Sequence, residues 1–366
     1  MLGAYPPAPW GPAGFICALT DALSARGSDV GVVRVADGSR SADRRVVGEL
    51  VNGSASSADE CVASLNQSDV AVIHHEHGLY GGAHGDALLD VIDGLCVPSI
   101  AVVHNVLKNP APHQRWVLER VAATVDRLVV LSEAARERLC REYGVDRYKI
   151  AMIPHGAVLP SGPRLKRGSR PVILTCGLLG PGKGVERVID VMSSLQSVPG
   201  RPRYLVAGPT HPKVLAGEGE TYRDARVEQA GRSGVADSVL LDGRCIDRAS
   251  LAALHQAAAV IVLPYDSADQ VASGALVAAV ASGRPVVATA FPHAVELLRD
   301  GAGSIVAHDD PEALAAALRR ILTQPRLAGA MAAKARQMAP AMAWPVVADA
   351  YLQVAAQLMA QRRTRV

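Results

Sequence analysis

The stretch between residues 263 and 276 carries the residues best suited to bind a charged ligand. It places the end of an apolar run, a loop with two aspartates and the start of a predicted helix in succession. The first amides of a helix have no intrahelical acceptor and lie at the positive end of its dipole, so the amides that follow Ser273 could bind a diphosphate. Gly274 would let that ligand approach the backbone closely. Asp269, just before the helix, could accept hydrogen bonds from sugar hydroxyls; the alternative is that it only caps the helix.

A glycine-rich turn with a lysine follows another predicted strand. Residues 175 to 184 read Thr-Cys-Gly-Leu-Leu-Gly-Pro-Gly-Lys-Gly and lead into a helix that starts at Val185. Amides in such a turn can surround a phosphate, and Lys183 would add a point charge. The spacing differs from that of a Walker motif, and neither Ser nor Thr follows the lysine to hold magnesium. The alternative is a plain surface turn.

Histidines gather at two predicted strand ends in the first half of the chain. His74-His-Glu-His77 ends one strand and His104-Asn105 ends the next, while residues 5 to 14 form a rigid loop before a helix expected to start near Phe15. The carboxyl ends of parallel strands meet at one edge of a sheet, so these groups indicate a site for a polar ligand such as a sugar. Two alternatives are a zinc ion bound by His75, His77 and His104, and histidines with only structural hydrogen bonds.

Short β-branched runs that alternate with helical patterns must position these residues. Continuous apolar strands between helices are typical of parallel sheets covered on both faces. Ser132 and Ser273 are suited to cap two of the helices, and Gly144 and Gly283 to end them. The predicted strands are 69–73, 99–103, 127–131 and 149–153, followed by 171–175, 203–207, 238–241, 260–263, 285–289 and 304–306.

The two series of strands predict an α/β protein with two doubly wound domains that face a cleft. A polar, breaker-rich segment at 159–170 is predicted to link an N-terminal domain of residues 1–158 to a C-terminal domain of residues 171–344. An amphipathic helix expected from Trp344 to Ala360 would cross back, so that residues 345–366 join the first domain. The alternative is a terminal helix on the second domain.

Length and composition exclude several classes of protein. The 366 residues exceed one ordinary core, and 49% hydrophobic with 20% charged residues is a folding composition. A net charge of +3 gives no argument for nucleic acid. The six cysteines lie far apart, and no pair of them has the spacing of metal ligands. The sequence also shows neither a signal peptide pattern nor an apolar run of 18 residues. These features predict a cytoplasmic protein without a transmembrane segment.

Taken together, these stretches resemble the family 4 glycosyltransferases, a retaining family with the GT-B fold, and within it the bacterial mannosyltransferase-like branch. The likeness runs in order along nearly the whole chain. The matching residues are Tyr5-Pro-Pro with Gly14, His75-Glu-His-Gly-Leu-Tyr-Gly-Gly82, His104-Asn-Val-Leu107, Ile153-Pro-His-Gly156, Gly177-Leu-Leu with Lys183-Gly184, Gly208-Pro-Thr-His-Pro212, Gly219-Glu-Thr-Tyr-Arg223, and Pro264-Tyr-Asp-Ser-Ala-Asp-Gln270 with Ser273-Gly274.

The resemblance implies a role for each part of the site. His104, Asp269 and Lys183 would be catalytic, with His104 facing the donor sugar, Asp269 holding its hydroxyls and Lys183 meeting the diphosphate. The other residues implied for the donor are Gly14, Gly180, Arg244, Cys245, Ile246, Ser273, Gly274, Ala275 and Leu276. The nucleobase would lie near Arg244 to Ile246 and be held mostly by the backbone there. Those implied for the acceptor are His75, Glu76, His77, Tyr80 and Trp10. Neither a metal nor a cofactor is expected besides the nucleotide sugar.

The expected reaction moves mannose from GDP-mannose to a saccharide or glycolipid, as in polysaccharide biosynthesis. Three departures from the family pattern bear on it. The usual pair of glutamates, the second of which normally holds the ribose, becomes Asp269 and Val277, and the usual arginine after Gly177 is Leu178. The expected first strand is also short, with only Met1 to Ala4 before Tyr5-Pro6. The alternatives are a UDP-glucose-dependent glucosyltransferase, a non-catalytic nucleotide-binding partner subunit, and a phosphorylase or nucleotide-sugar epimerase on the same fold. The acceptor, the linkage and the oligomeric state stay open, a homodimer being one alternative.

Overall fold

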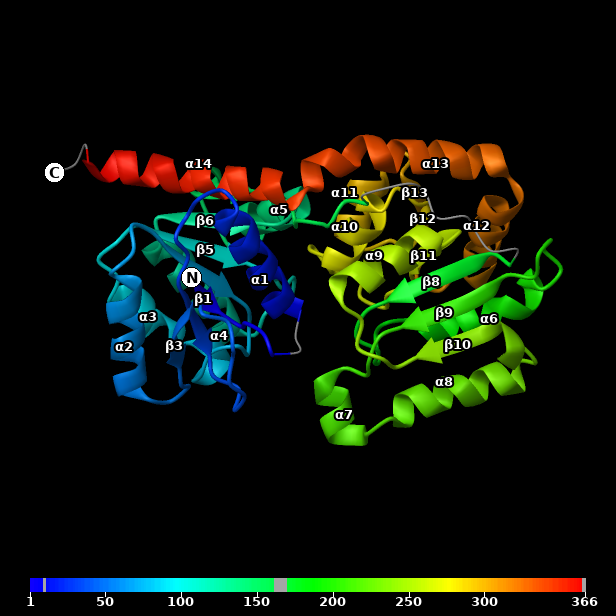
Figure 1. Cartoon of the computed structure of the whole chain (residues 1–366), viewed down its shortest axis with the longest axis horizontal. Coiled ribbons are helices and arrows are strands. Elements are labelled where there is room, and N and C mark those ends of the chain that lie inside the picture. The colour runs from blue at the N-terminus through cyan, green and yellow to red at the C-terminus, as the bar shows by residue number, and fades with distance from the viewer. Residues whose placement is uncertain (9–10, 161–169, 364–366) are drawn as a thin grey trace. The chain divides into compact units, whose positions relative to one another are not determined.

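The chain divides into two compact units, each with its own parallel sheet. The computed structural model describes residues 1–8, 11–160 and 170–363. Unit 1 comprises Met1–Gly156 and Trp344–Val366, and unit 2 comprises Ala157–Ala343 (Figure 1). Most of the predicted linker, residues 161–169, lies outside the described residues.

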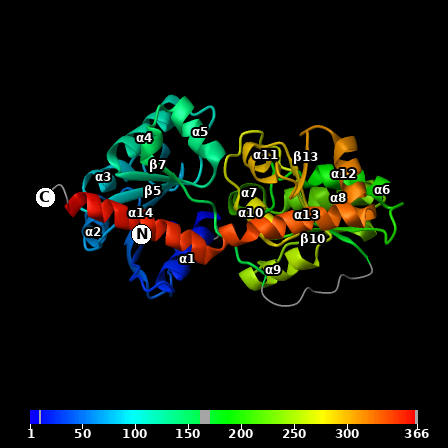
Figure 2. The ribbon, with the colours of Figure 1, turned by 90° about the horizontal axis from the view of Figure 1, so that it is seen from above.

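Unit 1 is built on a seven-stranded parallel sheet in the order β3-β2-β1-β4-β5-β6-β7. The order reverses between β1 and β4, which makes the sheet doubly wound and places a crevice at the carboxyl ends of those two strands. Figure 2 shows α4 and α5 on one side of this sheet and α1 and α14 on the other. The strands are β1 (Leu2–Gly3), β2 (Val32–Val35), β3 (Val46–Leu50), β4 (Ala71–His75), β5 (Ser99–Val103), β6 (Arg127–Val130) and β7 (Ile150–Met152), and the helices are α1 (Gly11–Ser24), α2 (Ala55–Leu65), α3 (Leu88–Asp93), α4 (Pro112–Thr124), α5 (Glu133–Glu142) and α14 (Trp344–Arg363).

Unit 2 repeats this plan with six parallel strands in the order β10-β9-β8-β11-β12-β13, and its crevice lies between β8 and β11. The strands are β8 (Val172–Cys176), β9 (Arg203–Ala207), β10 (Val239–Asp242), β11 (Val260–Leu263), β12 (Val286–Thr289) and β13 (Gly303–Val306). The helices are α6 (Val185–Leu195), α7 (Pro212–Glu218), α8 (Thr221–Arg232), α9 (Arg248–Ala257), α10 (Gly274–Ala281), α11 (Pro292–Leu298), α12 (Pro311–Thr323) and α13 (Pro325–Met338).

The two faces of the second sheet pack into separate apolar cores. Val260 and Val262 of β11 point into a core with α6 and α12. Ile261 and Leu263 of the same strand point into a core with α10, α11 and α13. Because successive side chains of a strand alternate between faces, a strand buried on both sides must be apolar throughout, and that pattern made these strands visible in the sequence.

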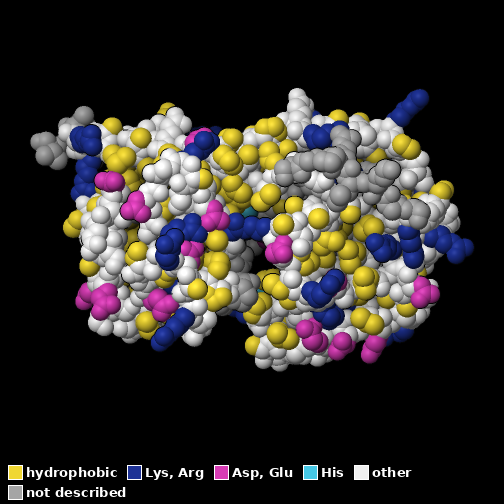
Figure 3. All heavy atoms as spheres, viewed as in Figure 1, with side chains coloured by type: hydrophobic (Ala, Val, Ile, Leu, Met, Phe, Trp, Pro, Cys, Tyr) yellow, Lys and Arg dark blue, Asp and Glu magenta, His cyan; other side chains and the backbone are white. Residues whose placement is uncertain are grey.

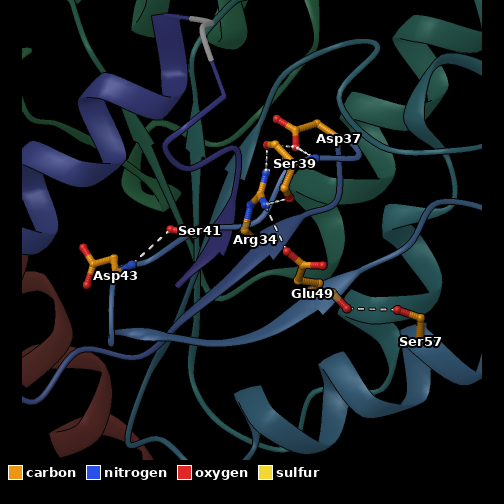
Figure 4. Close-up of polar contacts among 7 residues, drawn as sticks. All are labelled: Arg34, Asp37, Ser39, Ser41, Asp43, Glu49 and Ser57. Atoms are coloured by element: carbon orange, nitrogen blue, oxygen red, sulfur yellow. Dashed lines mark hydrogen bonds and ion pairs between the residues drawn. The ribbon is translucent and has the colours of Figure 1, made fainter.

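Two strands of unit 1, β2 and β3, were not among the predicted ones, and Arg34 is one physical reason. This arginine interrupts the apolar run of β2 yet is fully buried. Its guanidinium donates to Glu49 of β3 at 2.9 Å and to Asp37 at 2.5 Å, and it also bonds the Ser39 carbonyl (Figure 4). A buried charge is tolerated where carboxylates satisfy it, but the sequence alone places an arginine at the surface.

The helix after the first loop starts earlier than predicted. Helix α1 begins at Gly11 and not near Phe15, so Gly14 lies in its first turn and not in the loop. The predicted caps are confirmed, because Ser132 Oγ accepts the Ala135 amide of α5 and Ser273 Oγ accepts the Leu276 amide of α10.

The last helix, α14, belongs to unit 1. Its first residue, Trp344, packs edge-on against Phe15 of α1 with ring centroids 5.3 Å apart. Further along, Asp349 forms an ion pair with Arg26 at 2.7 Å. Gly156 leaves room for the indole, since a Cβ at this position would lie 2.2 Å from Trp344 Cδ2.

We expect Gly156→Ala to destabilise unit 1 by about 2 to 3 kcal/mol, because the added methyl group must displace a packed indole. All three tryptophans, Trp10, Trp116 and Trp344, belong to unit 1, so their fluorescence during urea unfolding reports on this unit alone. Gly14→Ala is the control for adding a methyl group in unit 1, because a Cβ there meets nothing within 4 Å and its backbone is not left-handed. An unchanged fluorescence midpoint for Gly156→Ala would contradict the packing described here.

Acidic and basic side chains are interspersed over the face shown in Figure 3. Within the described residues, the helices are too short or too polar to cross a membrane.

Candidate functional site

The glycine-rich turn after β8 is shaped by contacts that only glycine permits. Gly184 has φ +65°, and a Cβ there would lie 1.7 Å from the Pro264 carbonyl oxygen. Gly208, after β9, also lies close to the Gly177 carbonyl, since a Cβ on it would be 2.3 Å from that oxygen. Gly180 is buried, and its carbonyl accepts the Lys183 amide at 3.2 Å. The turn is therefore pressed against the ends of the neighbouring strands.

Lys183 is held over an aromatic ring at this edge. Its Nζ lies 4.5 Å from the centroid of the Tyr265 ring and 3.2 Å from the Tyr265 hydroxyl. Tyr265 in turn stacks on Phe291, with centroids 5.5 Å apart. An ammonium over a ring face is attracted to the ring quadrupole, which orients the lysine without neutralising it. The side chain thus remains a cation that an anionic ligand can meet.

Helix α10 begins at the carboxyl end of β11, beside this turn in the sheet order. The Ser273 amide donates to His293 Nδ1 at 2.9 Å, and the Ser273 side chain caps the Leu276 amide at 3.2 Å. Gly274 and Ala275 supply the amides of the first turn, which precede the intrahelical hydrogen-bond ladder. This arrangement suits an anion.

Asp269 lies half-buried in the loop before α10. The cap of the helix is Ser273, so the alternative that Asp269 serves only as a helix cap is wrong. The other aspartate of this loop, Asp266, has a separate function, because it pairs with Arg187 of α6 at 2.9 Å. Asp269 carries the other carboxylate of the loop.

The segment predicted to meet a nucleobase lies after β10. Arg244 folds back on Asp242, with Nη2 at 2.6 Å from Oδ2, and its side chain is 85% exposed. Cys245 is also exposed, whereas Ile246 packs against the core of unit 2. Because these side chains point to solvent or to the core, the backbone of this segment is the part that could contact a nucleobase.

Arg223 of α8 is a polar residue near these strand ends whose position the sequence did not reveal. It donates to the Gly208 carbonyl at 2.8 Å and to Glu220 at 3.1 Å. Its guanidinium carbon lies 3.3 Å from the position of a Cβ on Gly243, next to the predicted base segment. Its Nη1 is buried, and no partner for it occurs among the described residues. The sequence contained one indication of this residue, because Arg223 ends the stretch Gly219–Arg223 that matches the family pattern.

Val277 was expected to replace a ribose-binding glutamate, and the structure corrects this expectation. Its side chain is 1% exposed and packs in the core formed with α11 and α13. A side chain at this position of α10 points away from any ligand at the sheet edge. The neighbouring Ala278 is half-buried, as are Gly274 and Ala275, so these are the positions of the helix that face outward.

In unit 1, the histidines after β4 divide into two pairs. His75 and His77 lie edge to face with ring centroids 5.0 Å apart. The ring nitrogens of His77 are buried, and its ring lies within reach of the His84 backbone. The Nδ1 of His75 is also buried, and the described residues offer it no hydrogen-bond partner. Polar atoms in that condition are costly unless a ligand or water satisfies them. They are the best candidates in this unit to contact a polar ligand.

The remaining residues predicted for the acceptor differ in their surroundings. Tyr80 is buried, and its hydroxyl donates to the His74 carbonyl at 2.8 Å, so it supports the end of β4. Glu76 is half-buried at the start of the loop. Trp10 lies outside the described residues.

The second pair joins β4 to β5. His74 Nδ1 lies 2.9 Å from His104 Nε2, and the ring of Phe15 contacts both imidazoles edge-on. The register of the sheet explains why these two histidines are neighbours. His75 at the end of β4 lies opposite Val103 at the end of β5, and His104 is the residue that follows Val103. The zinc alternative finds no support, because the part of the chain that the structure describes contains no group of three or more potential ligands suitably placed for a metal.

Burial lowers the pKa of several histidines in unit 1. It lowers that of His75 and of His104 to about 3 and that of His155 to about 4. These groups bind fewer protons when folded than when unfolded, for which the pKa is about 6.5. Their contribution to stability is therefore complete above pH 6.5 and is lost as the pH falls.

We expect these three histidines to cost unit 1 about 3 kcal/mol of stability between pH 7 and pH 5.5, about 1 kcal/mol each, and His74, whose pKa burial also lowers, to add to the loss. Urea unfolding followed by tryptophan fluorescence at the two pH values measures the change. A stability that stays constant over this interval would mean that these imidazoles titrate in the folded protein with the same pKa as in the unfolded chain, so that burial does not lower their pKa.

Two doubly wound sheets, each with polar groups at its switch point, define the GT-B fold of nucleotide-sugar glycosyltransferases. Solved structures agree on this fold. HepE of Anabaena in complex with UDP and glucose superimposes with a TM-score of 0.77 at 16% identity, covering 97% of this chain and 98% of that one. A glycosyltransferase from Rickettsia africae gives a TM-score of 0.75 at 14% identity, covering 98% of both chains.

Sequence comparison names the family. The profile described as Glycosyltransferase Family 4 matches residues 11–159, and that of Glycosyl transferases group 1 matches residues 170–324. D-inositol 3-phosphate glycosyltransferases are 29% identical over 318 residues in Kineococcus radiotolerans, covering 76% of this chain and 70% of that one, and 29% identical over 335 residues in Xylanimonas cellulosilytica, covering 81% and 76%. The chain belongs to the family 4 glycosyltransferases and uses a nucleotide-sugar donor.

Proposed function

We propose that the protein is a retaining hexosyltransferase that moves mannose from GDP-mannose to a saccharide or glycolipid acceptor, without a metal ion. The observation that carries the proposal is the cation Lys183, held over Tyr265 beside the amide-rich start of α10. The amides of Ser273 and Leu276 already have protein partners. A positive side chain and the amides of Gly274 and Ala275 at adjacent strand ends can bind a diphosphate and stabilise it as a leaving group. Such a site does not require magnesium to offset the charge.

In this proposal each unit has its own ligand. The residues of unit 2 bind the donor, with Asp269 accepting hydrogen bonds from the sugar hydroxyls and the backbone at Arg244–Ile246 meeting the base. His75, Glu76 and His77 of unit 1 bind the acceptor, and His104 contacts the donor sugar. The acceptor attacks the face of the sugar from which the diphosphate leaves, and a phosphate oxygen of the donor takes the acceptor proton.

The identity of the base and of the sugar rests on the resemblance to the mannosyltransferase-like branch. UDP-glucose is the alternative donor, supported by the fold shared with a protein that binds UDP and glucose. D-inositol 3-phosphate enters as a candidate acceptor through the names of the relatives. The non-catalytic alternative remains in view, because neither Val277 nor the outward-facing Ala278 can hold a ribose.

Calorimetric titration of the purified protein with GDP, UDP, GDP-mannose and UDP-glucose, with EDTA present, tests the proposal. We expect GDP and GDP-mannose to bind with Kd values in the micromolar range and the uridine compounds to bind more weakly. Transfer assays with simple saccharides, lipid extracts and D-inositol 3-phosphate then follow with the donor that binds. Binding of the uridine compounds alone would replace mannose by glucose in the proposal, and tight nucleotide binding without turnover on any acceptor would favour the partner subunit.

A further inference from the structure

His74 is a buried histidine next to the candidate site to which neither the sequence pattern nor the proposed function assigns a role. Its side chain has no exposed surface, and its Nδ1 lies 2.9 Å from His104 Nε2. Its other nitrogen, Nε2, is buried, and within the described residues it has no hydrogen-bond partner. The single polar contact of this imidazole is therefore the one to His104.

The packing around His74 fixes the orientation of both rings. The ring of Phe15 lies edge-on to His74 at 5.7 Å and to His104 at 5.0 Å between centroids. Gly3 of β1 leaves room for the His74 side chain, because a Cβ on Gly3 would lie only 3.1 Å from the His74 Cβ. Neither imidazole can turn to exchange its nitrogens without displacing these neighbours.

Only one proton can lie between the two facing nitrogens. Burial lowers the pKa of both groups, so both are neutral near pH 7 and each carries one N–H. If His104 donated through Nε2, the N–H of His74 would have to lie on its Nε2, where it would be buried without an acceptor. If His74 donates through Nδ1, its Nε2 is an unpaired acceptor. Buried donors without partners are rarer than acceptors without them, which favours the second arrangement.

We propose that His74 is a positioning residue that donates Nδ1–H to His104 Nε2 and thereby holds His104 in the Nδ1–H tautomer. Which nitrogen of an imidazole carries the proton is set by the hydrogen bond that the other nitrogen makes. His104 then offers a hydrogen-bond donor, and not an acceptor, to an oxygen of the donor sugar. This inference rests on the proposed contact between His104 and that sugar.

Nitrogen NMR of histidine side chains tests the tautomer without any assay of activity. In the wild-type protein labelled with ¹⁵N-histidine, the spin system that disappears in His104→Ala should show a protonated Nδ1 and an unprotonated Nε2 between pH 8 and pH 5. In His74→Leu the same spin system should move toward a mixture of tautomers. His74→Gln, whose amide can donate, should restore the wild-type pattern. A wild-type His104 protonated on Nε2 would overturn the proposal even if His74→Leu failed to fold.

Kinetics of the same variants test the consequence. His74→Leu should lower kcat by about tenfold, as expected for the loss of one buried hydrogen bond, and His74→Gln should recover most of it. The matched control is His255→Leu, which removes a histidine of unit 2 that is also buried and should leave both the His104 signal and kcat unchanged. An unchanged kcat in both His74→Leu and His104→Ala would remove the proposed role of His104, whereas an unchanged kcat in His74→Leu alone would remove that of His74.

Discussion

Replacing Lys183 by alanine is expected to lower kcat/KM by about 100- to 1000-fold, the range found when a preorganised group that stabilises developing charge is removed. The ammonium is held by the face and the hydroxyl of Tyr265, so it meets the leaving diphosphate without first having to be ordered. Because the charge on the leaving group grows in the transition state, the loss should fall mainly on kcat. Steady-state kinetics with the donor identified by calorimetry measure the effect.

The matched control is Lys334→Ala, which removes the same charge from unit 2 at a lysine 4.0 Å from Asp300. We expect its kcat/KM to equal that of the wild type. Tyr265→Phe separates the two contacts of Lys183, since it keeps the ring and removes the hydroxyl, and a small loss is expected. Should Lys183→Ala retain wild-type kcat/KM, the diphosphate would have to be stabilised elsewhere and the proposed site would be wrong.

Gly184→Ala is expected to destabilise unit 2 by about 3 to 5 kcal/mol. The residue combines a left-handed backbone with a Cβ position 1.7 Å from the Pro264 carbonyl oxygen, so strain and overlap add. The overlap involves backbone, which cannot rotate away as a flexible side chain can. The loss of unit 2 structure should appear in far-UV circular dichroism during urea unfolding, while the tryptophan fluorescence of unit 1 serves as an internal reference.

Gly182→Ala is the control within the same turn. Gly182 is also left-handed, with φ +89°, but a Cβ there meets nothing within 4 Å. Its cost should be that of the backbone conformation alone, about 1 to 2 kcal/mol. Equal costs for the two variants would mean that the turn is not pressed against the end of β11.

Much of the fold could be predicted because buried parallel strands have a distinctive sequence. The runs at 99–103, 203–207 and 260–263 coincide with β5, β9 and β11. β2 and β3 could not be found in this way, since β2 contains a buried arginine and β3, at the edge of the sheet, alternates between half-buried and exposed residues before the buried Leu50. The start of α1 was misplaced because proline and glycine at its first positions are typical of loops as well as of first helical turns.

The candidate site was only partly within reach of sequence reasoning. Ser273 could be identified as a cap because the interaction spans three residues. The contact of Lys183 with Tyr265 joins residues 82 positions apart, and that of His74 with His104 spans 30. Such pairs depend on which strands are neighbours and on their register, which local pattern does not contain. For the same reason Val277 could be placed on a helix but not on the correct face of it.

Because α14 belongs to unit 1, the two units cannot complete their folding in the order in which they are synthesised. Unit 2 is one continuous stretch, whereas unit 1 is assembled from residues before and after it. Domains fold largely in the order of synthesis, but here the later domain can complete its core first. Until Trp344 emerges, the ring of Phe15 lacks its partner from α14. The apolar surface of α1 that packs on α14 is therefore left uncovered on the nascent chain until the whole second unit has been synthesised.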